Sequence, residues 1–195
     1  MLYASALAAA ATALVVALLA QGFGLSDPFV VLCLAVVAAF AERGTVRLSA
    51  TMEVSISVVP TLFAAVLFGP VAAMIVAAAS MLPDLRAPND QAYLRWAVYT
   101  ASRSITGGIA GLVAAGADSL VASQLGSIVL ATIVAALVSE SFSLVFAAAT
   151  VSVRRTSRFV DVIRSFGPMV YASIPLYAPI VAMLVLAYRD VSPWT

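Results

Sequence analysis

Long, unbroken runs of apolar residues constrain this chain more than any other feature of its sequence. Seven such runs cover residues 2–23, 29–41, 54–68, 71–82, 97–115, 128–151 and 166–188. Apolar residues that stand in blocks favour helices, because strands of a membrane barrel alternate apolar and polar side chains. The first run and the last three are long enough to cross the hydrocarbon core, which requires about 20 residues. We predict an all-α, polytopic transmembrane bundle of six to seven spans, in which the shorter runs are short spans across a thinned bilayer, re-entrant segments or helices shielded by neighbours.

The scarcity of charge supports a lipid environment. Hydrophobic residues make up 64% of the chain, charged residues make up 10%, and the mean hydropathy is +1.11. A soluble domain carries about a quarter charged residues, so this chain has too few to cover a water-facing surface, and its expected partner is the lipid bilayer. The net charge of +1 creates no field that would recruit nucleic acid. No repeat or linker divides residues 1–195, which we treat as a single integral membrane domain.

The residue inventory argues against an enzyme. The chain contains no His, so the commonest general base and the commonest metal ligand are both missing. Its single cysteine, Cys33, excludes an intrachain disulfide and a cysteine metal cluster, and its apolar surroundings predict a small buried side chain. No phosphate-binding loop and no zinc motif is present. We therefore predict no catalytic residue, no metal site and no cofactor.

The distribution of arginine predicts the orientation. The Arg residues of the connections follow the second, fourth and sixth runs: Arg43, Arg47, Arg86, Arg95, Arg154, Arg155, Arg158 and Arg164. The connections after the first, third and fifth runs contain none. Residues 2–23 are expected to remain as a membrane helix, since no Lys or Arg precedes them and the run is too long for a signal peptide. Seven spans with the N-terminus inside then place every Arg-bearing loop in the cytoplasm and residues 189–195 outside.

A turn signal separates the third and fourth runs. Gly69 permits a positive φ, and Pro70 lacks an amide hydrogen, so a tight turn between two antiparallel helices at or near a membrane surface is natural here. The alternative is one long helix over residues 54–82 that is kinked at this point. We favour the hairpin, because a single span would move Arg43 and Arg47 to the outside.

Two charges lie within long apolar runs. Glu140 is flanked by Ser139, Ser141 and Ser143, and Arg103 by Ser102 and Ser104. Charges at membrane depth are costly and face a bundle interior or a cavity, so we expect Arg103 and Glu140 to face inward and to neutralise each other. Two interpretations remain open. The pair lines a ligand or ion site together with Ser139 and Ser143, or it holds two helices in register.

The last run carries Pro168, Pro175 and Pro179 together with Tyr171, Ser173 and Tyr177. Each proline inside a helix removes one backbone hydrogen bond and leaves a carbonyl group without its partner. Broken helices with polar side chains border binding cavities in transporters, so Tyr171, Ser173 and Tyr177 are candidate ligand contacts. The alternative is a kinked packing helix whose polar side chains bond to their own backbone.

Gly107 and Gly111 form a small-xxx-small pair, with Gly108 adjacent. Such a pair lets a second helix approach closely. An internal contact is favoured over a homodimer interface, because small residues are common throughout this Ala-rich chain.

Short motifs resemble those of a known class of membrane region. They are Val54-Ser55-Ile56-Ser57, Pro60, Gly69-Pro70, Asp84-Leu85-Arg86 and the closing Ser192-Pro193-Trp194-Thr195. Together they resemble the N-terminal membrane regions of bacterial signalling proteins that carry HD-GYP or GGDEF output domains. The resemblance implies a sensory or anchoring module in the bacterial cytoplasmic membrane. It also implies that a further span and a cytoplasmic output domain follow residue 195.

The same Val-Ser-Ile-Ser, Pro and Gly-Pro pattern also resembles the S components of energy-coupling-factor vitamin transporters. Those are six-helix bundles that bind a small molecule and contact a coupling partner through small residues, a role that Ala35 and Ala39 match in type. This resemblance implies an S-component-like core and, as the alternative function, a substrate-binding transporter subunit. The extra N-terminal run and the arginine distribution depart from that pattern.

Overall fold

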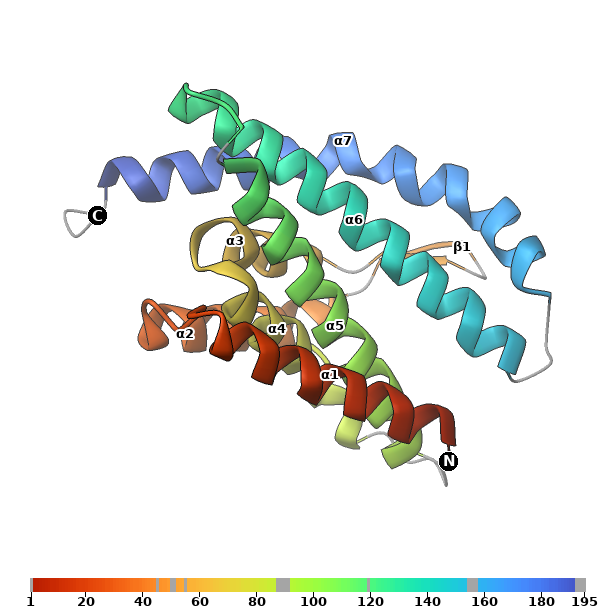
Figure 1. The fold of residues 1–195 in the computed structure, drawn as a ribbon. Coiled ribbons are helices and arrows are strands. Elements are labelled where there is room, and N and C mark those ends of the chain that lie inside the picture. The colour runs from red at the N-terminus through yellow and green to blue at the C-terminus, as the bar shows by residue number, and fades with distance from the viewer. Residues whose placement is uncertain are drawn as a thin grey trace.

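The computed structural model describes residues 2–44, 46–49, 52–54, 56–86, 92–118, 120–153 and 158–191. Its helices are α1 (Leu2–Ala20), α2 (Pro28–Arg43), α3 (Val58–Leu67), α4 (Gly69–Ala79), α5 (Ala92–Asp118), α6 (Gln124–Val153) and α7 (Phe159–Val191), with a short 3-10 helix, η1 (Leu82–Arg86) (Figure 1). Between α2 and α3, strands β1 (Val46–Ser49) and β2 (Met52–Val54) pair antiparallel. Each predicted apolar run corresponds to one of these helices. The helical class is therefore confirmed, apart from the two short strands β1 and β2.

Within the described residues, three helices, α1, α6 and α7, are long and apolar enough to cross a membrane by length and composition. This number is smaller than the six to seven spans predicted from the sequence. Helices α3 and α4 contain 10 and 11 residues, which at 1.5 Å per residue reach only about half the thickness of the hydrocarbon core. Helix α2 has 16 residues, and the 27-residue α5 carries Arg95, Arg103 and many small or hydroxyl side chains. The predicted run lengths therefore overstated the number of full-length spans.

Helix α2 shows how local sequence signals define an element. Asp27 is its N-cap, and the Asp27 carboxylate accepts a hydrogen bond from the Val30 amide at 3.2 Å. Pro28 occupies the first turn, where its missing amide hydrogen costs nothing. The buried side of α2 is the stripe of Val31, Ala35 and Ala38. Cys33 lies off this stripe and is exposed, so the prediction that it is buried was wrong.

The turn between α3 and α4 is a hairpin. Phe68 ends α3, and Gly69 has a φ of +82°, which reverses the chain. Ser57, just before α3, donates a hydrogen bond to Glu42 at the end of α2, whereas the other end of α3 leads to Pro70, which lies against Gly111 of α5. Because η1, which follows α4, also lies beside the end of α2, α3 and α4 run antiparallel and the single kinked helix is excluded, whereas the position of the turn at a membrane surface stays a prediction.

Helices α4 and α5 approach closely along a seam of glycines. A Cβ atom built on Gly111 would lie 2.5 Å from Pro70 Cα, and one on Gly107 would lie 2.7 Å from the Ala73 carbonyl oxygen. Pro70 opposite Gly111 and Ala73 opposite Gly107 show that the two helices run antiparallel. The small-xxx-small pair therefore makes an internal contact, as the sequence analysis favoured.

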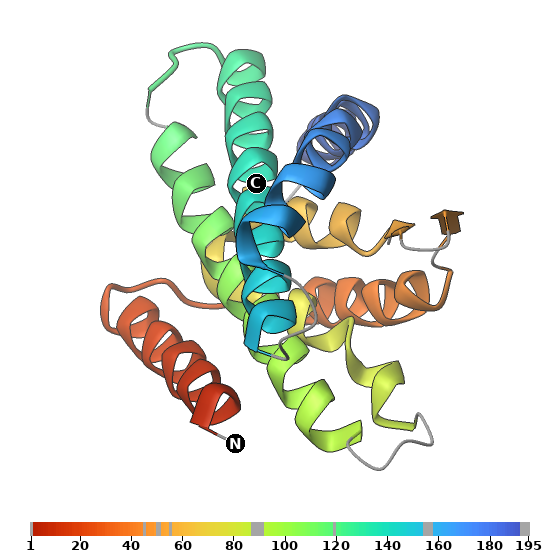
Figure 2. The same cartoon turned by 90° about the vertical axis from the view of Figure 1, so that its right-hand side faces the viewer.

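The short helices α3 and α4 occupy the interior of the bundle (Figures 1 and 2). Helix α4 is the most enclosed, and its buried residues are Pro70, Val71, Ala72, Ala73, Met74, Val76 and Ala77. Leu18 of α1 packs on Val71 and Met74 from one side, and α2 packs on Ala72 and Val76 from another. Of the three interpretations of the short runs, shielding by neighbouring helices describes α3 and α4.

The connections gather at two opposite ends of the bundle. Figure 1 shows the start of α1, the start of α5, strand β1, the end of α6 and the start of α7 towards one end. A hydrogen bond of 3.4 Å between Tyr3 Oη and Thr150 Oγ1 ties the start of α1 to the end of α6 there. At the other end, Tyr188 of α7 forms edge-on ring contacts with Phe63 and Phe68 beside the α3–α4 turn. Residues 154–157 and 192–195, which include Arg154, Arg155 and the closing motif, lie outside the described residues.

Candidate functional site

A cavity of about 430 Å³ lies between α5, α6 and α7. Its lining residues are Tyr99, Ser102, Arg103, Thr106, Glu140, Ser143, Leu144, Phe146, Ala147, Thr150, Val151, Val162, Phe166 and Val170. Apolar side chains dominate this lining, and a few hydroxyl groups and two charges supply its polarity. A largely apolar pocket with a small number of convergent polar groups is the usual form of a small-molecule site. The cavity is therefore the candidate site of this protein.

Arg103 reaches the cavity from the middle of α5 and forms an ion pair with α2. Its Nη2 atom lies 3.7 Å from Oε1 of Glu42. The other carboxylate oxygen of Glu42 accepts a hydrogen bond from Ser57 Oγ, and Ser57 is 1% exposed. Arg103, Glu42 and Ser57 therefore form a polar cluster that joins α5, α2 and the start of α3.

Glu140 lines the same cavity from α6 but has a different partner. Its Oε1 atom accepts a hydrogen bond of 2.8 Å from Tyr177 Oη on α7. Within the described part of the chain, no cationic side chain forms an ion pair with Glu140. The structure thus brings Arg103 and Glu140 to one cavity, as predicted, but the direct charge pair is Arg103–Glu42 and not Arg103–Glu140.

The remaining predicted contacts divide into two groups. Ser143 lines the cavity, whereas Ser139 is buried and does not line it. The Ser173 hydroxyl donates a hydrogen bond of 2.7 Å to the Val170 carbonyl of its own helix. This is the arrangement expected if α7 is a packing helix whose polar side chains bond to their own backbone. Tyr171 Oη lies 3.0 Å from Ser141 Oγ in an exposed bond, and none of Tyr171, Ser173 and Tyr177 is among the residues that line the cavity.

Sequence reasoning missed Glu42, although one signal pointed to it. Glu42 lies in the last turn of α2, where the partial negative charge of the helix end disfavours an acidic side chain. An acid in that position needs a compensating partner, which Arg103 and Ser57 provide. The hydroxyls of Thr106 and Thr150 carried no comparable signal, because Thr is common on the buried sides of membrane helices.

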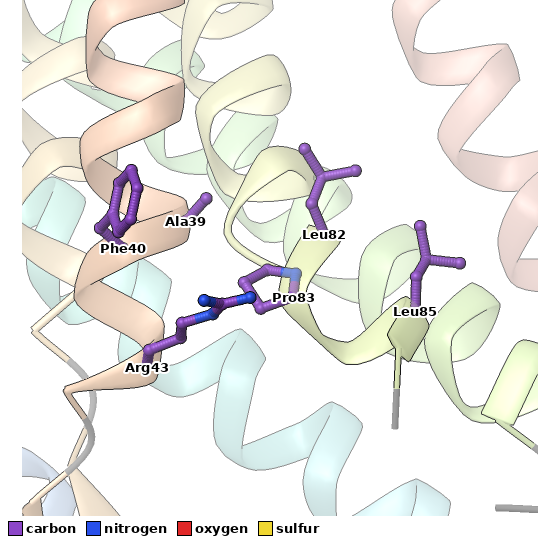
Figure 3. Close-up of a pocket in the computed structure, with 6 residues that line it drawn as sticks. All are labelled: Ala39, Phe40, Arg43, Leu82, Pro83 and Leu85. Atoms are coloured by element: carbon purple, nitrogen blue, oxygen red, sulfur yellow. The ribbon is translucent and has the colours of Figure 1, made fainter. Parts of the chain in front are cut away.

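A second, smaller cavity of about 370 Å³ lies between the end of α2 and η1. Figure 3 shows its six lining residues, with Ala39, Phe40 and Arg43 on α2 and Leu82, Pro83 and Leu85 on η1. Among the described lining residues Arg43 is the charged one, and the Arg43 side chain extends towards Pro83. This groove is separate from the site around Glu140.

Comparison with protein-family models, with curated proteins and with solved structures finds no match to the chain. Within the described residues, no group of three or more His, Cys, Asp or Glu side chains could hold a metal ion. Functional inference therefore depends on the geometry of the cavity.

Proposed function

We propose that this chain is the membrane-embedded sensory module of a bacterial signalling protein and that it binds a small organic cation in the cavity between α5, α6 and α7. The observation that carries the proposal is the environment of Glu140, a carboxylate on an apolar cavity that has a tyrosine donor and, among the described residues, no ion-pair partner, only the more distant charge of Arg103. A carboxylate in such a place is strongly favoured to pair with a positive charge. A ligand that carries a protonated amine supplies that charge.

The rest of the lining suits the same ligand class. Tyr99, Phe146 and Phe166 present aromatic rings to the cavity, and the face of an aromatic ring attracts a cation. Arg103 would repel a cation if it stood alone, but its charge is balanced by Glu42. The ligand therefore combines one amine with an apolar or aromatic body.

Helix α7 supplies a route from ligand binding to a conformational signal. Tyr177 lies between Pro175 and Pro179, which both fall inside α7 and remove backbone hydrogen bonds around it. A ligand amine at Glu140 competes with the Tyr177 hydroxyl for the same carboxylate. Release of Tyr177 shifts the balance between two arrangements of the kinked helix, and such a shift is the basis of a sensor.

The proposed orientation places the N-terminus and the Arg-bearing connections in the cytoplasm. Helices α2 and α5 cross the membrane along with α1, α6 and α7, and the α3–α4 hairpin enters the bundle and returns to the side from which it came. Because a hairpin returns to its side whether or not it crosses fully, the connections before α3 and after α4 remain on the same side.

The alternative function is a substrate-binding transporter subunit, for which small residues would contact a coupling partner. Ala35, one of the two candidates, is 7% exposed and packs inside the bundle with Ala64 and Ala72. Gly107 and Gly111 likewise pack against α4 inside the bundle. These small residues serve internal packing, which favours the sensory module over the transporter subunit.

Three probes of similar shape test the binding proposal: 2-phenylethylamine, 2-phenylethanol and phenylacetate. We expect the amine alone to raise the thermal stability of the full chain in lipid nanodiscs. Glu140→Gln should weaken amine binding about tenfold or more, because a charge-assisted hydrogen bond contributes about 1.5–3 kcal/mol. Asp161→Asn, a change of an exposed acid on α7, serves as the control.

Hydrogen exchange separates a sensor from an anchor. In a sensor, the amine should increase amide exchange around Tyr177 in wild-type protein. Amine binding with no change in α7 would reject the signalling step. Stronger binding of phenylacetate would reject the cation and assign the site to anions at Arg103. No binding of any probe would leave the anchoring role as the better description.

A further inference from the structure

We propose that the groove between α2 and η1 is a binding site for an anionic phospholipid. It lies apart from the Glu140 cavity and does not depend on the sensory function. Ala39 and Phe40 form one wall and Leu82, Pro83 and Leu85 the other, so the described residues that line it are apolar apart from Arg43 (Figure 3).

The apolar walls match an acyl chain. Phe40 is 69% exposed and Leu82 is 51% exposed, which would be unfavourable in water but suits contact with hydrocarbon. A furrow between two protein walls holds a single chain more firmly than a flat lipid-facing surface does, because the chain is contacted from both sides. The volume of about 370 Å³ accommodates the upper part of an acyl chain and a glycerol backbone.

Arg43 supplies recognition of the phosphate. The described part of the chain gives the Arg43 guanidinium no acidic partner. Adjacent positions on a helix point about 100° apart, and the neighbouring Glu42 is directed inward to Arg103 and Ser57. Arg43 is therefore left to the groove, where its planar guanidinium matches two oxygens of a phosphate diester.

The position along the chain agrees with a headgroup site. Arg43 is in the last turn of α2, at the junction between this apolar helix and the hairpin of β1 and β2. A basic pocket between helices at the cytoplasmic membrane surface is a typical arrangement for anionic lipid headgroups. An arginine at this junction can reach the phosphate while Phe40 stays at the depth of the acyl chain.

Native mass spectrometry of the purified full chain tests the proposal. The protein is mixed with equal amounts of phosphatidylglycerol and phosphatidylcholine that carry the same acyl chains. We expect wild-type protein to retain phosphatidylglycerol about fivefold more than phosphatidylcholine, the preference that one basic residue near an anionic lipid provides. Arg43→Gln should abolish the preference and Arg43→Lys should keep most of it. Arg158→Gln, which removes an exposed charge at the start of α7, should leave it unchanged.

A second variant tests the groove itself. Ala39→Phe adds a ring to one wall while Arg43 stays, and it should reduce retention of both lipids. Excess inorganic phosphate distinguishes a lipid site from a site for free phosphate. A lipid site keeps its bound phosphatidylglycerol, whereas a site for free phosphate loses the lipid to the added ion. Equal retention of the two lipids by wild-type protein would overturn the proposal. So would a loss of the phosphatidylglycerol preference in Arg158→Gln as large as the loss in Arg43→Gln. Helical circular dichroism of each variant confirms that it is folded.

Discussion

Nη2 of Arg103 lies 3.7 Å from Oε1 of Glu42. The carboxylate in the last turn of α2 therefore neutralises the positive charge of the arginine in the middle of α5. The sequence had suggested Glu140 as the partner, because both charges lie in long apolar runs. The ion pair with Glu42 frees Glu140 for the Tyr177 hydroxyl and leaves the two carboxylates with different roles. One holds helices together, and the other faces a cavity.

Removal of one member of the Arg103–Glu42 pair should destabilise the protein more than removal of both. Glu42→Gln alone removes the ion pair of the partly buried Arg103, and Arg103→Met alone removes this cation from the carboxylate of Glu42. The two side chains are 31% and 16% exposed, so solvent weakens their attraction, and we expect a coupling energy of about 1–2 kcal/mol in a double-mutant cycle. Unfolding of the four proteins in detergent by heat or by SDS measures it. A cycle of Arg103→Met with Glu140→Gln is the control, and a coupling there as large as with Glu42 would contradict the assignment.

Tyr177→Phe should both destabilise the protein and tighten its binding of 2-phenylethylamine. The lost hydrogen bond to Glu140 contributes about 1.5–3 kcal/mol to stability. The same loss removes a competitor for the carboxylate, so the amine gains affinity. Tyr171→Phe is the matched control, because Tyr171 is exposed and its hydroxyl bonds to Ser141 away from the cavity lining, and it should change neither quantity appreciably. Weaker amine binding in Tyr177→Phe would show that the tyrosine contacts the ligand instead of competing with it.

Gly111→Ala and Gly107→Ala should each destabilise the bundle by about 1–3 kcal/mol through overpacking. The new methyl group would collide with Pro70 or with the Ala73 carbonyl, and both are backbone groups that cannot turn aside. Gly116→Ala on the same helix has no atom within 4 Å of its new Cβ, so it should be neutral or slightly stabilising, since Ala favours helix. Thermal unfolding followed by circular dichroism compares the three variants. Equal effects at all three positions would refute close packing of α4 on α5.

Gly69→Ala should destabilise the protein although space is available for its methyl group. The Cβ would meet nothing within 4 Å, but the φ of +82° is unfavourable for any residue with a Cβ. We expect a cost of about 1–2 kcal/mol, measured as the loss of unfolding free energy. An unchanged stability would mean that the α3–α4 turn adopts another conformation in the membrane.

Cysteine labelling in a Cys33→Ala background tests the proposed orientation. Ala122→Cys, between α5 and α6, should react with a membrane-impermeant maleimide in intact cells. Val160→Cys, at the start of α7, should react only after the cells are opened, because the arginines around it hold it in the cytoplasm. Both positions are exposed, so a difference in labelling reports the side of the membrane. The reverse pattern would invert the topology.

The sequence by itself determined the helical class and the approximate position of each α-helix in the chain. Blocks of apolar residues identified each of the α-helices in the described part of the chain, and the Gly69-Pro70 signal located the hairpin turn, because positive φ and the absence of an amide hydrogen act locally. Helix ends were less well predicted. Helices α5, α6 and α7 extend beyond their apolar runs, and α7 begins at Phe159 instead of residue 166, since polar residues continue a helix once it has formed.

Only the tertiary structure decided which polar groups meet. Arg103 could pair with any acid at its depth, and the choice of Glu42 depends on how α2 lies against the α3–α4 hairpin. Tertiary structure also decided which helices are buried. Helix α4 is enclosed by α1, α2 and α5, whereas the equally apolar α1 is largely exposed. Composition makes a helix apolar, but the arrangement of its neighbours determines whether that helix faces protein or lipid.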